Sequence, residues 1–561
     1  MYEKATLSKA RKLEEAWRGE LSRRHGDMEI TAATDANIPL KPLYTPMDME
    51  KISLDDIAAP GVYPYTRGLY PLQYQAMPWM MQFAFGYGLP EHCRKRYEFL
   101  RQKGMRGYED RESTYFIAWD LPTKLGIDPD HPEAKGRVGL CGSTTSTMDD
   151  FDRLFKGVQL DRTNVVVPID ECTAVMLAMF VAYAEEQGFK LQDLRGNTFN
   201  WLYHQWFWDT PSFSTRHVFP LMIEVIKFCV KNLPRWNHTL IDGYNAEEAG
   251  ANAIQEIGAT LAVHIALTEE CIKAGLDPDQ FITGFSGHLA FGRDFFEDVA
   301  KARVTRRMWA KINKERFGCK NPRALKFRFQ AETAGSMLTA QQPLNNITRL
   351  SLGTLAAVLS GASAIWTCGY DEAISIPTEE AAETGVRIQQ IIYHESGVPS
   401  VSDPLGGSYY LESLTNEMEA EVEKFLDEVE ANGGYIQCWE SGWFTNEIQK
   451  TAREWNRALA TNEKIKVGVN EYVTEKELKV PPFSHPKDVE ETAIARIKQY
   501  KEERDGPKTQ KALEGLKAEA KKVADGNGEL MPALIEAAKA RATLQEMMDI
   551  MKETFGYGFP C

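Results

Sequence analysis

Eight short apolar runs alternate with longer helix-forming segments between about residues 110 and 375, and this alternation constrains the fold more than any other feature. The runs are rich in β-branched and aromatic residues, which strands favour. They are TYFIAWD (114–120), RVGLCGS (137–143), NVVVPID (164–170), NTFNWL (197–202), HTLIDGYN (238–245), FITGFSG (281–287), LKFRFQAE (325–332) and SAIWTCGYDE (363–372). Segments between them, such as TAVMLAMFVAYAEEQG, have helical periodicity. Eight strand–helix units predict an α/β protein with a closed parallel (β/α)8 barrel, the TIM-barrel fold.

The barrel is expected to span residues 61–415, with a further segment on either side. Residues 1–60 combine a charged helix with the extended, proline-bearing stretch NIPLKPLYTPMDM, which suits an arm lying on the barrel or on a partner. Residues 416–561 contain heptad-like and amphipathic stretches, which predict a helical C-terminal region. The charge runs in that region are typical of solvated helix faces.

Composition limits the kinds of partner. A net charge of -15 argues against nucleic-acid binding, because phosphate contacts need clustered lysine and arginine. No apolar run approaches the roughly 20 residues of a membrane span, and the charged N-terminus does not resemble a secretory signal. Nine cysteines without a CxxC pair indicate reduced thiols. We therefore expect a cytoplasmic protein that binds neither nucleic acid nor membrane.

Several common catalytic motifs do not occur. The sequence contains no GxxxxGK[ST], HExxH or GxSxG, and its ten histidines form no metal-ligand cluster. The glycine-rich GFSGHLAFG and GLCGS lack the strand–loop–helix spacing of a dinucleotide site. These observations speak against a serine hydrolase or a zinc hydrolase, and we expect no metal bound by the chain's own ligands.

Polar residues stand where most of the predicted strands end. In a (β/α)8 barrel the catalytic groups lie at these carboxyl ends, although a solvated rim would also be polar. We favour a functional role for them. The residues are Asp120, Cys141, Asp170, Tyr244, Asn245, Ser286, His288, Gln330, Glu332 and those from Cys368 to Glu372.

The stretch NTFNWLYHQWFWDT (197–210) holds six aromatic residues within ten positions. Such density either fills a core or lines a pocket for a bulky apolar ligand. Alternate residues of a barrel strand face the helices, so core packing accounts for about half of these aromatics. We expect the others to form walls of the substrate pocket.

Several collinear stretches together resemble the large subunit of the adenosylcobalamin-dependent acyl-CoA mutases, the methylmalonyl-CoA and isobutyryl-CoA mutase family. The resemblance runs from about residue 40 to the C-terminus. The stretches are LKPLYTP, YPYTRGLYP, WDLPTKLGIDPDHP, LPRWNHTLIDGYNAEEAGA, LTAQQPLNNITR, YDEAISIPTEEA and HESGVPSVSDPLGGSYYLESLT.

The resemblance implies a radical 1,2-rearrangement of an acyl-CoA. The cobalt–carbon bond of adenosylcobalamin breaks homolytically, hydrogen is taken from the acyl group, and a fragment of the carbon skeleton migrates. The cofactor supplies the difficult step, so the protein orients the substrate and excludes water and oxidants. An apolar, aromatic barrel interior suits that task.

The resemblance also implies roles for individual residues. Tyr244 stands beside the reacting centre, with Asn245 as the second catalytic residue. Residues at substrate-binding positions are Tyr70, Gln73, Met77, Phe83, Ala84, Phe199, His204, Trp208, Asp209, Ser286, His288, Arg323, Arg328 and Gln330. Residues at cofactor-binding positions are Trp119, Cys141, Glu332, Gly335, Cys368 and Glu372, the last beside the adenosyl ribose.

This chain departs from the family at its substrate pocket. Asn245 replaces a histidine that hydrogen-bonds the thioester carbonyl; an amide can still donate but cannot carry a proton. Ala84 stands where methylmalonyl enzymes have a tyrosine, or Phe83 does if the alignment slips by one residue. Phe199 replaces a glutamine. Asp209 falls about where an arginine binds the free carboxylate of a malonyl group, and its charge would repel that group.

Three basic family positions near CoA are also altered, to Met77, Gln82 and Gly284. Retention of DLPT and of the other channel residues argues that CoA remains the carrier. We therefore expect a branched or bulky acyl-CoA without a free carboxylate. An alternative is a hydroxyacyl-CoA whose hydroxyl is accepted by Asp209 or His204, and a methylmalonyl substrate conflicts with Ala84 and Asp209.

Single-chain members of the family continue into a cobalamin-binding domain with a DxHxxG motif, which does not occur here. A separate small subunit is therefore expected to bring the cobalamin and its cobalt, with two large subunits in a heterotetramer and a possible GTPase chaperone. The other possibilities are a truncated chain and a catalytically silent scaffold subunit. Retention of Tyr244 and Glu372 argues against a catalytically silent subunit.

Overall fold

The computed structural model describes residues 2–26, 32–107, 113–167, 169–202, 211–475 and 479–558, and two parallel sheets form its centre. One sheet has the order β4 (Ser113–Phe116), β5 (Thr163–Val167), β6 (Arg195–Thr198) and β8 (Trp236–Asn237). The other has the order β3 (Met80–Gln82), β12 (Ala364–Trp366), β11 (Phe329–Thr333), β10 (Phe285–Phe291) and β9 (Thr239–Asp242). All neighbouring strands in both sheets are parallel. The predicted α/β class is confirmed.

The two sheets meet at both of their edges. Only His238 separates β8 from β9, so the chain passes directly from one sheet into the other, and the Leu240 amide donates to the Phe199 carbonyl at 2.8 Å. Beyond the other edge, the Phe85 amide donates to the Phe116 carbonyl at 3.0 Å, and the Ala118 amide donates back to Phe85 at 2.9 Å. The strands therefore follow one another in chain order.

Seven of the eight predicted runs contain or overlap a strand, and the run at 137–143 was wrong. That run is a series of turns, because Gly139 has a φ of 71° and a side chain on Gly142 would collide with the backbone of Trp119. Sequence analysis missed β3, which has three residues and none of them β-branched, and β8, whose two residues precede the run at 238–245. In the run 281–287, residues before Phe285 are helical, and β10 continues to Phe291.

Helices alternate with these strands and cover them. They are α3 (Pro90–Gln102), α4 (Leu121–Lys124), α5 (Met148–Phe155), α6 (Thr173–Glu186), α7 (Thr215–Asn232), α8 (Tyr244–Glu248), α9 (Ala253–Lys273), α10 (Pro278–Phe281), α11 (Phe295–Lys311), α12 (Asn345–Leu359) and α13 (Glu379–Glu395). The sequence of α6 is apolar on every face, as expected of a helix that is covered on both sides. The second cover is α19 (Leu530–Lys539), from the C-terminal part of the chain.

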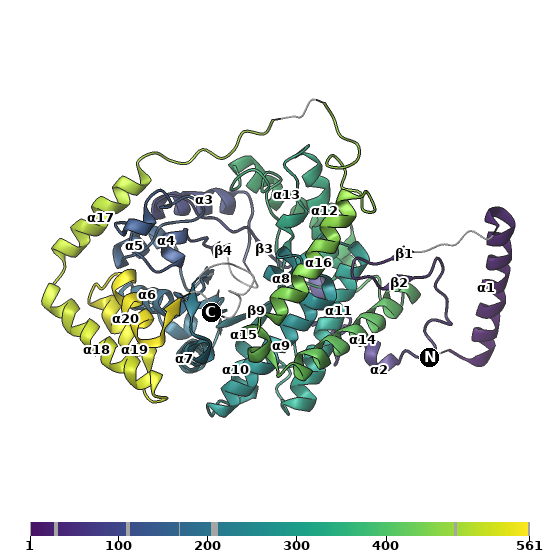
Figure 1. Ribbon diagram of the computed structural model, residues 1–561, viewed down its shortest axis with the longest axis horizontal. Helices are drawn as coiled ribbons and strands as arrows, with labels where there is room; N and C mark the ends of the chain where they lie inside the picture. The colour runs from purple at the N-terminus through teal and green to yellow at the C-terminus, as the bar shows by residue number, and fades with distance from the viewer. Residues whose placement is uncertain are drawn as a thin grey trace.

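The N-terminal segment begins with α1 (Lys4–His25), which lies at one end of the molecule (Figure 1). It continues through the antiparallel pair β1 (Ala32–Ala33) and β2 (Pro39–Leu40) to α2 (Leu54–Ile57). Asp35, between β1 and β2, pairs with Arg293 at 2.7 Å and with Lys464 at 2.5 Å. The segment after α1 is thus tied to the body of the protein by ion pairs.

The C-terminal part is helical, and its first helix, α14 (Tyr409–Ala431), runs across the expected boundary at residue 415. After α15 (Tyr435–Glu440) and α16 (Trp443–Ala460), the chain arcs over the molecule to α17 (Val489–Glu503) (Figure 1). The chain ends with α18 (Gly506–Ala524), α19, α20 (Leu544–Phe555) and β13 (Tyr557–Gly558), which pairs antiparallel with β7 (Ser212–Phe213).

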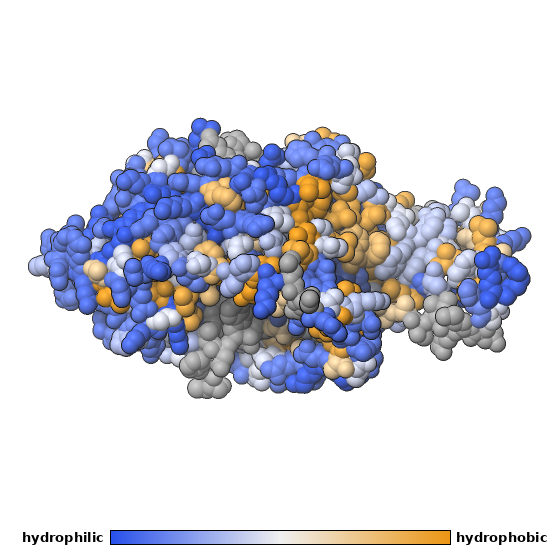
Figure 2. All heavy atoms as spheres, turned by 90° about the horizontal axis from the view of Figure 1, so that it is seen from above, coloured by the Kyte–Doolittle hydropathy of each residue, from blue (hydrophilic) through white to orange (hydrophobic). Residues whose placement is uncertain are grey.

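The surface agrees with the charge of the chain. The face in Figure 2 is largely hydrophilic, with hydrophobic residues gathered near its middle. Within the ranges that the structure describes, no helix is long and apolar enough to cross a membrane. The eight cysteines in those ranges form no disulfide.

Candidate active site

A cavity of about 460 Å³ lies at the amino ends of the central strands and extends between them. Its lining includes five of the predicted substrate-binding residues, Tyr70, Ser286, Arg323, Arg328 and Gln330. Asn164, Asn197 and Asn237 add amide groups that sequence analysis did not single out. Gln73 and Met77 were also predicted to bind substrate, but neither lines this cavity.

The cavity has a basic mouth, formed by Arg195, Arg235, Arg323, Lys326 and Arg328. Among the described residues that line the cavity, none is acidic. Burial and the neighbouring Arg328 lower the pKa of Lys326, whose ammonium lies 4.8 Å from the centre of the Tyr70 ring. Cations gathered at one opening favour an anionic ligand. Sequence analysis missed Arg195, Arg235 and Lys326, although each stands at or just before the start of a strand.

The glycine at position 284 has a structural explanation. A side chain there would meet the imidazole of His238, whose Nε2 lies 2.3 Å from the position that a Cβ would take. Burial lowers the pKa of His238 to about 3, so this ring is neutral. A larger residue at position 284 would require the buried His238 ring to move.

A hydrogen-bonded triad is formed by Asp242 at the end of β9, His288 in the middle of β10 and Glu332 near the end of β11. His288 Nδ1 lies 3.0 Å from Asp242 Oδ1, and His288 Nε2 lies 3.0 Å from Glu332 Oε2. All three side chains are buried. Both ring nitrogens can donate only when the imidazole is protonated. The geometry therefore favours an imidazolium held between two carboxyl groups.

The electrostatics of the triad agree with this geometry. Burial alone would lower the pKa of His288, but hydrogen bonds to Asp242 and Glu332 outweigh burial and raise the pKa to about 9. Burial raises the pKa of Glu332 to about 7, although the contact with His288 opposes the shift. Sequence analysis placed His288 with the substrate and Glu332 with the cofactor, and it gave Asp242 no role. The position of Asp242 directly before Gly243 and Tyr244 was the available signal.

Tyr244 and Asn245 join the triad from the first turn of α8. The Tyr244 ring stacks on the His288 imidazole with centres 4.6 Å apart and an interplanar angle of 22°. Asn245 Nδ2 donates to Asp242 Oδ2 at 2.8 Å. One amide hydrogen of Asn245 is therefore engaged by the protein, and it is not available to a thioester carbonyl.

Aromatic side chains form a wall beside the triad. The Phe199 ring lies 4.4 Å from Trp201 and 6.0 Å from Phe116, while the centres of Phe199 and His288 are 6.3 Å apart. Trp366 stands 5.2 Å from Phe116. The first part of the aromatic stretch thus lies beside the triad. His204, Trp208 and Asp209 lie outside the described residues.

Gln82 and Phe83, which follow one another along the chain, lie in different surroundings. Gln82 lines the cavity, whereas the Phe83 ring comes within 3.1 Å of the position that a Cβ on Gly385 in α13 would take. Phe83 therefore faces the helix layer. Ala84 follows the end of β3, is buried, and is not among the residues that line the cavity.

Glu248, Gly335 and Glu372 lie next to Tyr244. A Cβ on Gly335 would be 3.4 Å from Glu248 Oε2 and 3.9 Å from both Glu372 Cγ and Tyr244 Oη. Burial, reinforced by Glu332 and Asp371, raises the pKa of Glu372 to about 8. Its Oε2 is buried and has no hydrogen-bond partner among the described residues.

The other predicted cofactor residues differ in their surroundings. Cys368 is buried, and its thiol donates to the Thr333 carbonyl at 3.1 Å. Trp119 is buried with no partner for its indole N–H in the described part of the chain, and Cys141 is exposed. No described contact joins Trp119 or Cys141 to Glu332 and Glu372.

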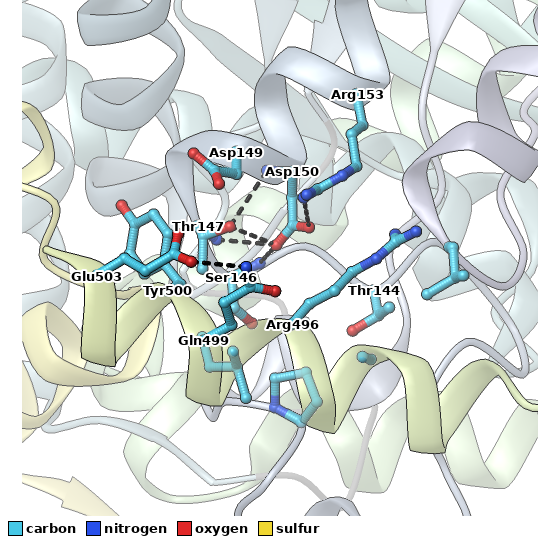
Figure 3. A pocket seen from close by; sticks show the side chains of 14 residues that line it. Thr144, Ser146, Thr147, Asp149, Asp150, Arg153, Arg496, Gln499, Tyr500 and Glu503 are labelled. Carbon is cyan, nitrogen blue, oxygen red and sulfur yellow. Dashed lines mark hydrogen bonds and ion pairs between the residues drawn. The ribbon is translucent and has the colours of Figure 1, made fainter.

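A second pocket, of about 70 Å³, separates α5 from α17 (Figure 3). Arg153 and Arg496 extend into this region, and Asp150 accepts hydrogen bonds from Thr147 and from the Ser146 amide. The space suffices for a few water molecules but not for an acyl-CoA. This small pocket lies at the interface between the C-terminal helices and the rest of the protein.

Comparison with known proteins gives the class of this site. The sequence model of the methylmalonyl-CoA mutase family matches residues 33–557. The 2-hydroxyisobutanoyl-CoA mutase large subunit of Aquincola tertiaricarbonis is 38% identical over 530 residues, which cover 93% of this chain and 92% of that protein. Methylmalonyl-CoA mutase of Rhizobium meliloti is 34% identical over 93% of this chain and 72% of its own length. The human mitochondrial enzyme is 32% identical over 93% and 68%.

These comparisons identify the chain as an acyl-CoA mutase, an isomerase that transfers a group within one molecule. The chain belongs to the methylmalonyl-CoA mutase family, which depends on adenosylcobalamin. The predicted family and the predicted enzyme class are confirmed.

Proposed function

We propose that this chain is the large subunit of a carbon-skeleton mutase that rearranges an acyl-CoA without a free carboxylate. The observation that carries the proposal is the cavity with its basic mouth, which extends from the amino ends of the strands to Ser286 and Gln330. Its cations suit the phosphates of CoA. Its inner end leads to Tyr244, where the acyl group would react.

The proposal includes a closed (β/α)8 barrel around that cavity. The backbone bonds at Leu240 and Phe85 join the two sheets at both edges, which supports closure. The reacting groups would then stand at the carboxyl ends of the strands and the CoA phosphates at the amino ends. A thioester would lie along the barrel axis.

Adenosylcobalamin fits the groups around Tyr244. The unpartnered Oε2 of Glu372 suits a ribose hydroxyl, and the absence of a side chain at Gly335 lets a ligand approach Glu248 and Glu372 closely. When bound, the cofactor supplies the radical that starts the rearrangement. The chain's own aromatic residues Phe116, Phe199 and Trp366 would exclude water, and the stack on His288 would fix the ring of Tyr244.

We assign the cobalamin and its cobalt to a separate small subunit, and two large subunits to the working heterotetramer in the cytoplasm. The name of the Aquincola tertiaricarbonis relative, a large subunit that matches along 92% of its length, supports this division. The scaffold alternative is less well supported, because Tyr244 and Glu372 stand together at one site.

Acidic groups around Tyr244 argue against a free carboxylate on the substrate. Asp242, Glu248, Glu332 and Glu372 surround this end, and His288 is the single basic group among the site residues described there. A hydroxyacyl-CoA is the second candidate. It is favoured by the polar triad and by the relative that acts on 2-hydroxyisobutanoyl-CoA.

Reconstitution tests the proposal. The chain alone should bind cobalamin weakly and show no mutase activity, and addition of a small cobalamin-binding subunit with adenosylcobalamin should restore both. Tight stoichiometric cobalamin binding by the chain alone would contradict the division into subunits. In a panel of CoA thioesters, methylmalonyl-CoA and succinyl-CoA should be poor substrates, and preference for them would contradict the assigned substrate class.

A further inference from the structure

We propose that Asp242, His288 and Glu332 select the acyl group, and that they favour an uncharged acyl group bearing a hydroxyl over an apolar acyl group of the same shape. This inference rests on the proposed function, because it takes the cavity as the acyl-CoA site. It assigns to the triad a hydroxyl-binding role that the sequence suggested for His204 or Asp209.

The position of the triad supports this role. Ser286 and Gln330 line the cavity, and two residues further along the same strands stand His288 and Glu332. Gln330 Nε2 lies 3.4 Å from His288 Nε2, so the cavity lining touches the triad directly. An acyl group that advances from the cavity toward Tyr244 must pass these side chains.

Aromatic side chains flank the triad on two sides. Phe199 and Trp201 face His288 from one side and the Tyr244 ring covers it from another. An apolar acyl group placed there would displace water from the carboxyl groups without replacing its hydrogen bonds, which is unfavourable. A hydroxyl can replace one of those bonds. A carboxylate would add a like charge next to Glu332 and Glu372.

Glu332 is the group best placed to accept that hydroxyl. Its interactions in the described structure are the contact from His288 at 3.0 Å and a hydrogen bond with Tyr244. A carboxylate offers about four lone-pair positions, so these two leave room for another donor. His288, held on its other side by Asp242, fixes the orientation of the Glu332 carboxyl group. His288 and Asp242 are positioning residues in this account.

A matched pair of thioesters tests the inference in the reconstituted complex. Pivalyl-CoA and 2-hydroxyisobutyryl-CoA differ only by a methyl group in place of a hydroxyl. We expect kcat/KM to favour the hydroxy compound by at least about tenfold. Calorimetric titration of the large subunit with each thioester should show the same order in Kd, a readout that does not depend on turnover.

Variants locate the discrimination. Glu332→Gln and His288→Phe should reduce the preference to less than about threefold, in kcat/KM and in Kd alike. Glu297→Gln is the matched control: Glu297 is also buried, burial raises its pKa to about 7, and it accepts from the Ala36 amide outside the site. This control should keep the full preference.

The outcomes separate the two proposals. If no thioester binds or turns over, the proposed function fails and the inference fails with it. If pivalyl-CoA serves the wild-type complex as well as or better than 2-hydroxyisobutyryl-CoA, the inference alone is overturned. A full preference retained in Glu332→Gln would likewise overturn it. Should His288→Phe not fold, the nearly isosteric Glu332→Gln still shows whether the preference comes from the triad.

Discussion

The charged side chains at the two ends of the central strands differ in their exposure and in their partners. At the cavity mouth, Arg235 and Arg323 are exposed cations, and no acidic residue joins them in the described lining. At the other end, next to Tyr244, His288 lies between Asp242 and Glu332. Exposed cations at the mouth are available to an anionic ligand, whereas the buried charges of the triad interact with one another. The mouth should therefore govern binding, and the triad should govern stability and the choice of acyl group.

Removing the cation of the triad should have the largest effect. In His288→Phe, two buried carboxyl groups lose their shared partner, and the free energy of unfolding should fall by about 3–5 kcal/mol. Urea denaturation of the purified chain measures it. The double variant His288→Phe/Glu332→Gln removes one of the carboxyl groups and should recover part of the loss. Equal stability of His288→Phe and wild type would show that the triad is not a coupled unit.

The pH dependence of stability should come from His288, Glu332 and Glu372. The folded pKa of His288 is raised to about 9, so its contribution is complete below pH 6.5 and is lost as the pH rises toward 9. Burial raises the pKa of Glu332 and Glu372 to about 7 and 8, so the folded form also holds their protons more tightly, and stability falls as pH rises above about 4.5. All three shifts act in one direction.

From the shift of His288 alone we expect the free energy of unfolding to be lower at pH 9 than at pH 6 by about 3 kcal/mol, and Glu332 and Glu372 add to this difference. Denaturation at a series of pH values measures this slope. Glu332→Gln should flatten it, and Glu297→Gln should leave the part due to the triad in place. A slope of opposite sign would contradict the assignment of a protonated His288.

Neutralising the mouth should weaken binding without changing stability. Arg323→Ala or Arg235→Ala should each raise the Kd for an acyl-CoA by about tenfold, or about 1.4 kcal/mol, and high salt should reduce the difference. The corresponding acyl-pantetheine, which lacks the nucleotide phosphates, should bind both variants as it binds wild type. Arg457→Ala, which removes an exposed cation paired with Glu463, is the matched control. A tenfold loss for acyl-pantetheine would place the phosphates elsewhere.

Replacing Asn245 should have a smaller effect than replacing an arginine of the mouth. Asn245→Ala removes the bond to Asp242 and should cost about 1 kcal/mol of stability, with turnover slowed by roughly tenfold or more. Because an amide does not titrate near neutrality, the pH–rate profile should keep its shape in this variant. If turnover is unchanged, the second amide hydrogen of Asn245 has no role in holding the thioester.

Disrupting the contact between α5 and α17 should have the smallest effect on stability and on binding. Arg496→Ala breaks the partly exposed pair with Glu91 and should change the free energy of unfolding by no more than about 1 kcal/mol. Kd values for acyl-CoA should not change. A larger effect on binding than on stability would give this second pocket a role that its size does not suggest.

Much of the fold was predictable because short stretches of sequence encode its strands and helices. Strand and helix periodicities gave the alternation and the α/β class, and seven of eight runs contained or overlapped a strand. The failure at 137–143 came from Gly139 and Gly142, whose turn and close approach to Trp119 involve another part of the chain. The strand β3 was missed because its three residues carry little pattern of their own. Local signals do not report contacts between distant segments.

By itself, the sequence determined the family and the polar strand ends, and it predicted Tyr244 and Glu372 as residues of the active site. The tertiary structure decided how these groups are connected. Asp242, His288 and Glu332 are separated by 46 and 44 positions along the chain, and they form one hydrogen-bonded triad only because β9, β10 and β11 are adjacent and in register. It also decided that Phe83 faces α13 and that five cations share one mouth. Hydrogen bonding and charge interactions depend on distances in space, and periodicity along the chain fixes only the face on which each residue lies.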